Sequence, residues 1–73
     1  SNYRANESEQ TMTNKDMAKR RMHKVEGETF CFEQHITLGV RRNATSTIQV
    51  FFRIIQNVLY IAYIGEHLDV SST

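Results

Sequence analysis

The sequence predicts an α+β fold, with one short N-terminal helix followed by a three-stranded antiparallel β-meander. Between residues 13 and 27 the apolar residues recur at helical spacing, whereas from residue 28 onward they alternate with a period of two. The chain has 73 residues, which is enough for one small domain. We therefore expect a single domain over residues 13–73. Residues 1–12 are polar and have no periodic pattern, so we expect them to form a flexible tail.

The helix is expected to begin at Thr13 and to end at Gly27. Thr13 fits an N-cap, and Asp16 in the first turn is favoured by the helix dipole. Ala18, Met22 and Val25 then form one narrow apolar face. A helix of about a dozen residues is only marginally stable alone, so this face must pack on the sheet.

Three runs of alternating residues, 28–38, 47–55 and 58–64, predict the strands. Gln56-Asn57 is the expected turn between the last two runs, although it lacks the glycine of the best hairpin turns. With this turn, Arg53 faces Tyr60 and Phe52 faces Ile61 across the hairpin. Further from the turn, the same register places Phe51 opposite Ala62 and Val50 opposite Tyr63.

Alternation also assigns side chains to the two faces of the sheet. The expected core face carries eleven large side chains: Phe30, Phe32, Ile36, Leu38, Ile48, Val50, Phe52, Ile54, Leu59, Ile61 and Tyr63. The second face is also apolar, with Phe51, Ile55, Val58, Tyr60, Ala62 and Ile64. One short helix cannot cover both faces, so we expect a partner surface, most simply a homodimer through sheet faces or edge strands.

Basic residues are concentrated near the N-terminus, although the net charge of the chain is only +1. Such clustering is compatible with a nucleic-acid partner, and the alternative is an ordinary solvated helix face. Unpaired bases can also stack on aromatic side chains of a sheet. The candidate nucleic-acid-binding residues are Lys19, Arg20, Arg21 and Lys24 on the helix, Arg41 and Arg42 in a loop, and Arg53 and Tyr60 on a sheet face.

His67 is the best catalytic candidate, because it lies just past the third strand, where functional side chains often occur. His35 shares a strand face with Glu33, which either orients its imidazole for chemistry or forms a plain polar pair. A single cysteine, Cys31, excludes a multi-cysteine zinc site, and no other ligand spacing is recognisable. We therefore expect no metal and no cofactor.

The apolar runs are too short to span a bilayer, and no secretory signal is recognisable. The expectation is therefore a cytoplasmic protein that has no membrane partner.

The stretches 47–54 (TIQVFFRI) and 59–67 (LYIAYIGEH) resemble the C-terminal hairpin of RelE-type toxins. That family consists of small α+β proteins that bind an antitoxin and typically cleave messenger RNA on the ribosome. The resemblance implies a catalytic role for two residues, with Arg53 contacting the phosphate or the transition state and His67 serving as general acid or base.

Two functions are therefore open. The first is a small RNA-targeting toxin-like protein, either a RelE-like ribonuclease or a relative that retains only RNA binding. The alternative is a non-catalytic, oligomerising protein-interaction module that uses the second apolar sheet face. Whether the chain is an enzyme is left open by its residues.

Overall fold

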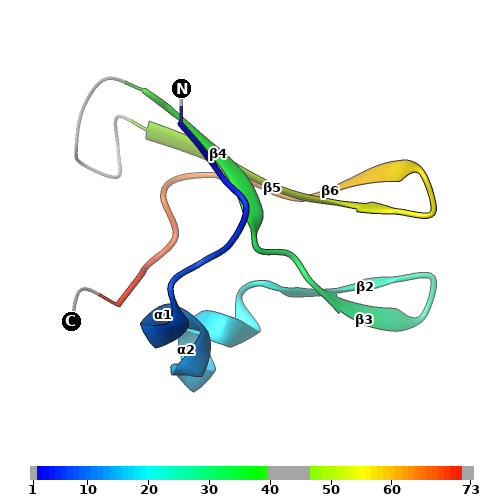
Figure 1. Ribbon diagram of the computed structural model, residues 1–73, viewed down its shortest axis with the longest axis horizontal. Coiled ribbons are helices and arrows are strands. Elements are labelled where there is room, and N and C mark those ends of the chain that lie inside the picture. Colours follow the sequence, from blue (N-terminus) through cyan, green and yellow to red (C-terminus); the bar gives the residue numbers. More distant parts are fainter. Residues whose placement is uncertain (1, 40–46, 72–73) are drawn as a thin grey trace.

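The structure is a computed structural model, and it describes residues 2–39 and 47–71. Within these ranges the chain forms six β-strands and two short α-helices. In chain order they are β1 (Asn2–Arg4), α1 (Glu9–Thr13), α2 (Lys15–Lys19), β2 (Met22–Val25), β3 (Glu28–Cys31), β4 (Gln34–Gly39), β5 (Thr47–Ile55) and β6 (Val58–Gly65). Four strands form one antiparallel sheet in the order β1-β4-β5-β6, and β2 and β3 form a separate hairpin (Figure 1).

The predicted fold of one helix and a three-stranded meander is wrong, because most of the expected helix is not helical. Asn14 caps α2 by accepting a hydrogen bond from the Met17 amide at 3.1 Å, and α2 ends at Lys19. The next residues form β2 and turn back into β3 through Glu26 and Gly27, which both have positive φ, at 50° and 86°. Gly27 is therefore a hairpin turn residue rather than a helix stop, since this turn type needs positive φ at both central positions.

The first predicted strand is divided into two strands that belong to different sheets. Residues 28–31 pair with β2, and residues 34–39 pair with β5. At the break, the Phe32 amide donates a hydrogen bond of 2.7 Å to the Arg21 carbonyl. The separate β2–β3 hairpin can therefore pack against the β5–β6 hairpin, where Val25 and Phe30 contact the core cluster.

Residues 2–12, which the sequence suggests as a tail, contain β1 and most of α1. Strand β1 extends the sheet along the edge of β4, with Tyr3 opposite Ile36. Helix α1 is capped by Ser8, whose hydroxyl oxygen accepts from the Thr11 amide at 3.1 Å. These elements bring the N-terminal part of the chain against residues 66–71, which we call the C-terminal segment. The contact is a hydrogen bond from the Ser71 amide to the Thr11 hydroxyl oxygen.

The β5–β6 hairpin is confirmed, including its two-residue turn. Gln56 and Asn57 have φ values of 50° and 67°, and Phe52 faces Ile61 as the alternation predicts. Beyond Phe52 the predicted register is wrong by one residue, because the ladder shifts between Phe51 and Phe52. Phe51 therefore faces Tyr63 and not Ala62, as expected of a β-bulge that places one extra residue on β6.

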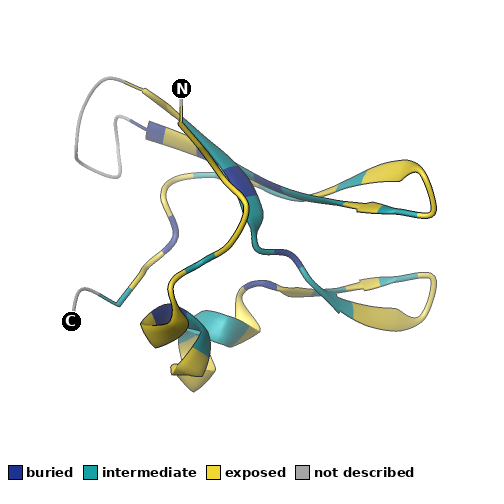
Figure 2. Cartoon of the chain, in the orientation of Figure 1, coloured by how far each residue is buried: buried dark blue, intermediate teal, exposed yellow. Residues whose placement is uncertain are grey.

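The assignment of the core face is confirmed for Phe32, which is buried in the core, and for Phe30 and Tyr63, which pack against it, but it is wrong for the other large side chains of β4, β5 and β6. The buried core consists of Phe32, Phe51 and Leu68, and the side chains packed against it include Tyr60 and Ala62. Phe51, Tyr60 and Ala62 mark the inner face of the sheet, which is covered by the helices, the β2–β3 hairpin and the C-terminal segment (Figure 2). The β5 side chains that were expected in the protein core lie on the opposite face of the sheet, the outer face. The inner face can carry polar side chains because the covering segments provide their hydrogen-bond partners.

The double substitution Gln56→Asn/Asn57→Gly is expected to raise the free energy of unfolding by about 1 kcal/mol. Both positions have positive φ, which an asparagine–glycine pair adopts more readily than the natural glutamine–asparagine pair. Urea unfolding measures the effect. Gly27→Ala is the matched opposite change and should cost about 1 kcal/mol, since no atom lies within 4 Å of the added Cβ and only backbone strain opposes it. Identical unfolding midpoints for these variants would contradict the turn geometry.

Candidate functional site

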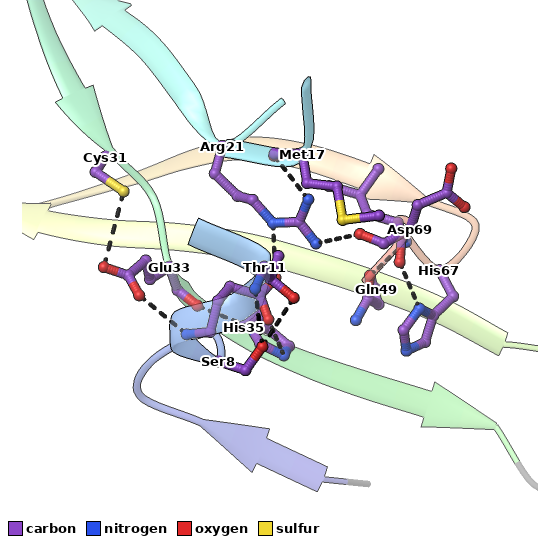
Figure 3. A network of polar contacts seen from close by, with 12 residues as sticks. Ser8, Thr11, Met17, Arg21, Cys31, Glu33, His35, Gln49, His67 and Asp69 are labelled. Carbon is purple, nitrogen blue, oxygen red and sulfur yellow. Dashed lines mark hydrogen bonds and ion pairs between the residues drawn. The ribbon is translucent and has the colours of Figure 1, made fainter. Parts of the chain in front are cut away.

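A buried arginine organises the inner face of the sheet. Arg21 comes just after Arg20, the C-cap of α2, and its side chain is 0% exposed. Its Nε donates to Glu7 Oε2 at 2.7 Å, its Nη1 to the Met17 carbonyl at 2.9 Å and its Nη2 to the Asp69 carbonyl at 2.9 Å (Figure 3). The guanidinium also lies 5.5 Å from the centroid of the Phe51 ring. Arg21 therefore joins three segments of the chain to the core.

Glu7 and His35 continue this network. The Glu7 amide donates to Glu33 Oε1 at 3.0 Å, and Glu7 Oε1 lies 4.0 Å from His35 Nε2. The His35 ring is buried and stacks on Phe51 with a centroid distance of 4.6 Å. Its Nδ1 lies 2.7 Å from the Glu33 carbonyl oxygen, which can only accept, so Nδ1 carries the proton. The Nε2 atom of His35 is therefore the one that faces Glu7.

An open polar pocket of about 510 Å³ lies beside this network, between β1, α1, β4, β5 and the C-terminal segment. Both His35 and His67 line the pocket, so the structure brings together two of the three histidines. His67 Nδ1 lies 2.8 Å from the Leu68 carbonyl oxygen, which fixes its proton on Nδ1 as in His35. We take this pocket as the candidate site.

Gln49 is a pocket residue that the sequence does not single out. Its side chain is 1% exposed, and its Oε1 accepts from the Leu68 amide at 2.7 Å. Its Nε2 donates to the Thr37 hydroxyl oxygen at 3.3 Å. Gln49 thus attaches the segment that carries His67 to the sheet (Figure 3). The signal in the sequence is a lone polar residue between Ile48 and Val50.

Arg53 does not share the site of His67. Its Nη1 donates to the Cys31 carbonyl at 2.8 Å, and its guanidinium lies 5.2 Å from the Phe30 ring centroid. Arg53 pairs with Tyr60 near the turn of the hairpin, while Gln49 pairs with Gly65, two residues before His67. Four residues of strand separate these pairs, about 13 Å at ~3.3 Å per residue. Arg53 therefore joins the β2–β3 hairpin to β5.

The predicted nucleic-acid-binding cations are found in different environments. Lys19 and Lys24 are exposed, whereas Arg21 is fully enclosed. Arg20 is exposed and lies 3.9 Å from an Asp69 carboxylate oxygen. Arg41 and Arg42 lie outside the described residues.

Cys31 has the features of a structural thiol rather than a nucleophile. Burial raises the pKa of the Cys31 thiol, and the neighbouring Glu33 carboxylate raises this pKa further. The thiol donates to Glu33 Oε2 at 3.8 Å, which favours its protonated form. Among the residues that the structure describes, no three His, Cys, Asp or Glu side chains gather to hold a metal ion.

The outer face of the sheet is a second candidate surface. Seven large apolar side chains on it are 43–65% exposed: Tyr3, Leu38, Ile48, Ile54, Leu59, Ile61 and Ile64. Large aromatic side chains bury about 150–250 Å² when fully enclosed, and the isoleucine and leucine side chains that make up most of this set are somewhat smaller. Seven half-exposed ones therefore leave on the order of 700 Å² of apolar surface open to solvent, above the roughly 300–600 Å² of the largest patch on a typical monomer.

In comparisons with known proteins, no family model, no curated protein and no solved structure matches this chain. The resemblance to RelE-type toxins therefore stays a prediction. Both helices within residues 2–39 and 47–71 are too short to cross a membrane.

Proposed function

We propose that this chain is a protein-interaction module that associates through the outer face of its four-stranded sheet, and that the partner is a second copy of the chain. The observation that carries the proposal is the open apolar surface of roughly 700 Å² on that face. A standard protein–protein interface buries about 800 Å² on each partner, so two such faces provide nearly the area that a stable dimer needs.

The composition of the outer face supports a partner of the same kind. The strand residues that point outward are Tyr3, Gln34, Ile36, Leu38, Ile48, Val50, Phe52, Ile54, Leu59, Ile61 and Ile64. None of them is charged, and the cores of interfaces are likewise depleted of charge. The polar ends of Gln34 and Tyr3 satisfy each other through a hydrogen bond of 3.2 Å.

A second copy fits this surface because an uncharged, apolar face is complementary to itself. A two-fold axis brings the same patch of both subunits together, so the surface needs no charge of opposite sign. Two sheets can stack in this way about 10 Å apart, with their side chains interdigitating as in a β-sandwich. The proposed dimer is therefore a face-to-face pair of sheets.

This proposal differs from the sequence-based alternative in the face that it uses. The second apolar face of that alternative includes Phe51, Tyr60 and Ala62, which belong to the intramolecular core or pack against it. The RNA-targeting function stays a prediction. The two residues that it would use for catalysis, Arg53 and His67, lie apart and do not form one site.

Sedimentation velocity of the wild type and of Ile61→Lys tests the proposal. We expect the wild type to sediment with twice the mass of one chain at micromolar concentration. Ile61→Lys should weaken this association by at least about tenfold, because the dimer would bury a charged group without a partner. Ile61 is half-exposed on β6, so its replacement should leave the monomer folded.

Thr29→Lys is the matched control, because it adds the same charge at an exposed position of β3, away from the outer face. Its dimerisation should equal that of the wild type. A wild-type chain that stays monomeric up to about 100 μM, or an Ile61→Lys variant that dimerises normally, would contradict the proposal.

A further inference from the structure

The polar pocket lies on the inner face of the sheet, away from the proposed dimer interface. Its lining residues His35 and Thr37 on β4, and Gln49 on β5, alternate with the outward-pointing residues of these strands. The pocket volume of about 510 Å³ falls within the roughly 300–1,000 Å³ of small-molecule sites. A ligand in this pocket therefore leaves the outer face free.

The lining is suited to a polar ligand. Val70 is the one aliphatic residue of the lining, and the others supply hydroxyl, amide, imidazole and charged groups. Among the described residues that line the pocket there is no phenyl, phenol or indole ring on which a base could stack. These properties favour a small, highly polar molecule over an apolar one or an exposed nucleobase.

The two histidines present the same ring atom for binding. Each Nδ1 is committed to a backbone carbonyl, Glu33 for His35 and Leu68 for His67. A proton taken up by either ring therefore goes to Nε2 and makes it a charged donor. His67 Nε2 has no partner within the part of the chain that the structure describes, and His35 Nε2 is 4.0 Å from Glu7 Oε1.

The charges around the pocket favour an anion. Arg4 lines the pocket and makes no ion pair within residues 2–39 and 47–71. The one lining carboxylate, Glu7, is neutralised by Arg21 at 2.7 Å, and Arg21 has no second carboxylate partner among the described residues. Beside His67 in the chain, Glu66 and Asp69 are exposed to solvent, which screens their charges.

From this arrangement we infer that the pocket binds the phosphate group of a small polar phosphate monoester. Arg4 and the Nε2 atoms of His35 and His67 are the proposed contacts. Charge-assisted hydrogen bonds from guanidinium and imidazolium groups to phosphate oxygens are among the stronger polar contacts in proteins. The ligand would bridge β1, β4 and the C-terminal segment, which places it where the two ends of the described chain meet.

The test follows the imidazole NMR signals of His35 and His67 during titration with sulfate at pH 6. We expect saturable shifts of both signals, because the anion would contact the Nε2 atom of each ring. In the same assay ribose 5-phosphate should compete with sulfate, and ribose should not.

Arg4→Gln and His67→Gln should each weaken sulfate binding at pH 6 at least about fivefold, a loss of about 1 kcal/mol. Both positions are exposed, so the fold should persist. Lys24→Gln is the matched control, since it removes one exposed positive charge outside the pocket and should leave binding unchanged. Linear shifts without saturation, or equal weakening by all three variants, would indicate an adventitious ion only and overturn the inference. Ribose competing as well as ribose 5-phosphate would overturn it too.

Discussion

Arg21→Met is expected to lower the free energy of unfolding by about 3–5 kcal/mol, the range for removing one partner of a buried ion pair. Arg21 is 0% exposed and holds the Glu7 carboxylate, which is itself nearly enclosed. Without the guanidinium, Glu7 and two backbone carbonyls lose their hydrogen-bond donor away from water. Because small proteins are stable by only about 5–15 kcal/mol, the variant should lose a large fraction of its stability.

Chemical denaturation of the wild type and three variants checks this expectation. Arg20→Met is the matched control: Arg20 is 57% exposed and its ion pair with Asp69 is long, so its loss should cost about 0.5 kcal/mol or less. The double variant Arg21→Met/Glu7→Gln should recover part of the stability, because no buried charge is left without a partner. Equal losses for Arg20→Met and Arg21→Met would refute the buried role of Arg21.

Phe51→Ala should destabilise the fold by about 3–5 kcal/mol, whereas Phe52→Ala should cost about 1 kcal/mol. Phe51 is 1% exposed and contacts His35, Arg21 and Tyr63. Phe52 lies on the outer face, is only half-buried and contacts the Tyr3 ring at a centroid distance of 6.2 Å. Removal of the Phe51 ring therefore opens a cavity in the core, and removal of the Phe52 ring does not.

These adjacent residues are a direct test of which sheet face is the core. Both variants should be compared by urea unfolding at a concentration low enough to keep the chain monomeric, so that loss of the proposed dimer does not add to the Phe52→Ala result. A larger loss for Phe52→Ala would restore the face assignment that alternation alone suggests and would contradict the structure.

Alternation in residues 47–64 is sufficient to predict the β5–β6 hairpin, because a period of two over such lengths excludes a helix. It favours the wrong face of β5, since the outer face is wholly apolar whereas the buried face also carries Gln49 and Arg53. It also cannot reveal the bulge, which depends on how β6 packs and shifts every pair beyond Phe52. The polar partners that make the face with Gln49 the buried one come from segments distant in sequence.

The prediction for the region before residue 28 is wrong for a different reason. Ala18, Met22 and Val25 have helical spacing, but so short a pattern also fits a helix followed by a strand. Glu26-Gly27 does carry a hairpin signal, because an acidic residue before glycine resembles the favoured Asp-Gly pair. The burial of Arg21 has no local signal, since a run of basic residues normally marks a solvated surface and its acidic partner lies 14 residues earlier.

For the candidate site, the sequence identifies His67 and singles out His35, but it does not place them in one pocket. The two are brought together by the antiparallel pairing of β4 with β5 and by the bond between Gln49 and Leu68. Arg53 is paired with His67 by the family resemblance alone, and strand geometry places it near the other end of the hairpin.

The contacts of Arg21 and Thr11 also bear on how the chain reaches its native state. Arg21 bonds to Asp69 across 48 residues, and Thr11 bonds to Ser71 across 60 residues. Closing loops of this length costs conformational entropy before any contact compensates for it, so a topology rich in such contacts folds slowly. Until the C-terminal segment docks, Arg21 and Glu7 can remain hydrated, which delays the desolvation of both charges to a late step. The hairpins, whose contacts are local, should therefore form first. The N-terminal elements and the C-terminal segment should dock against each other in a later step.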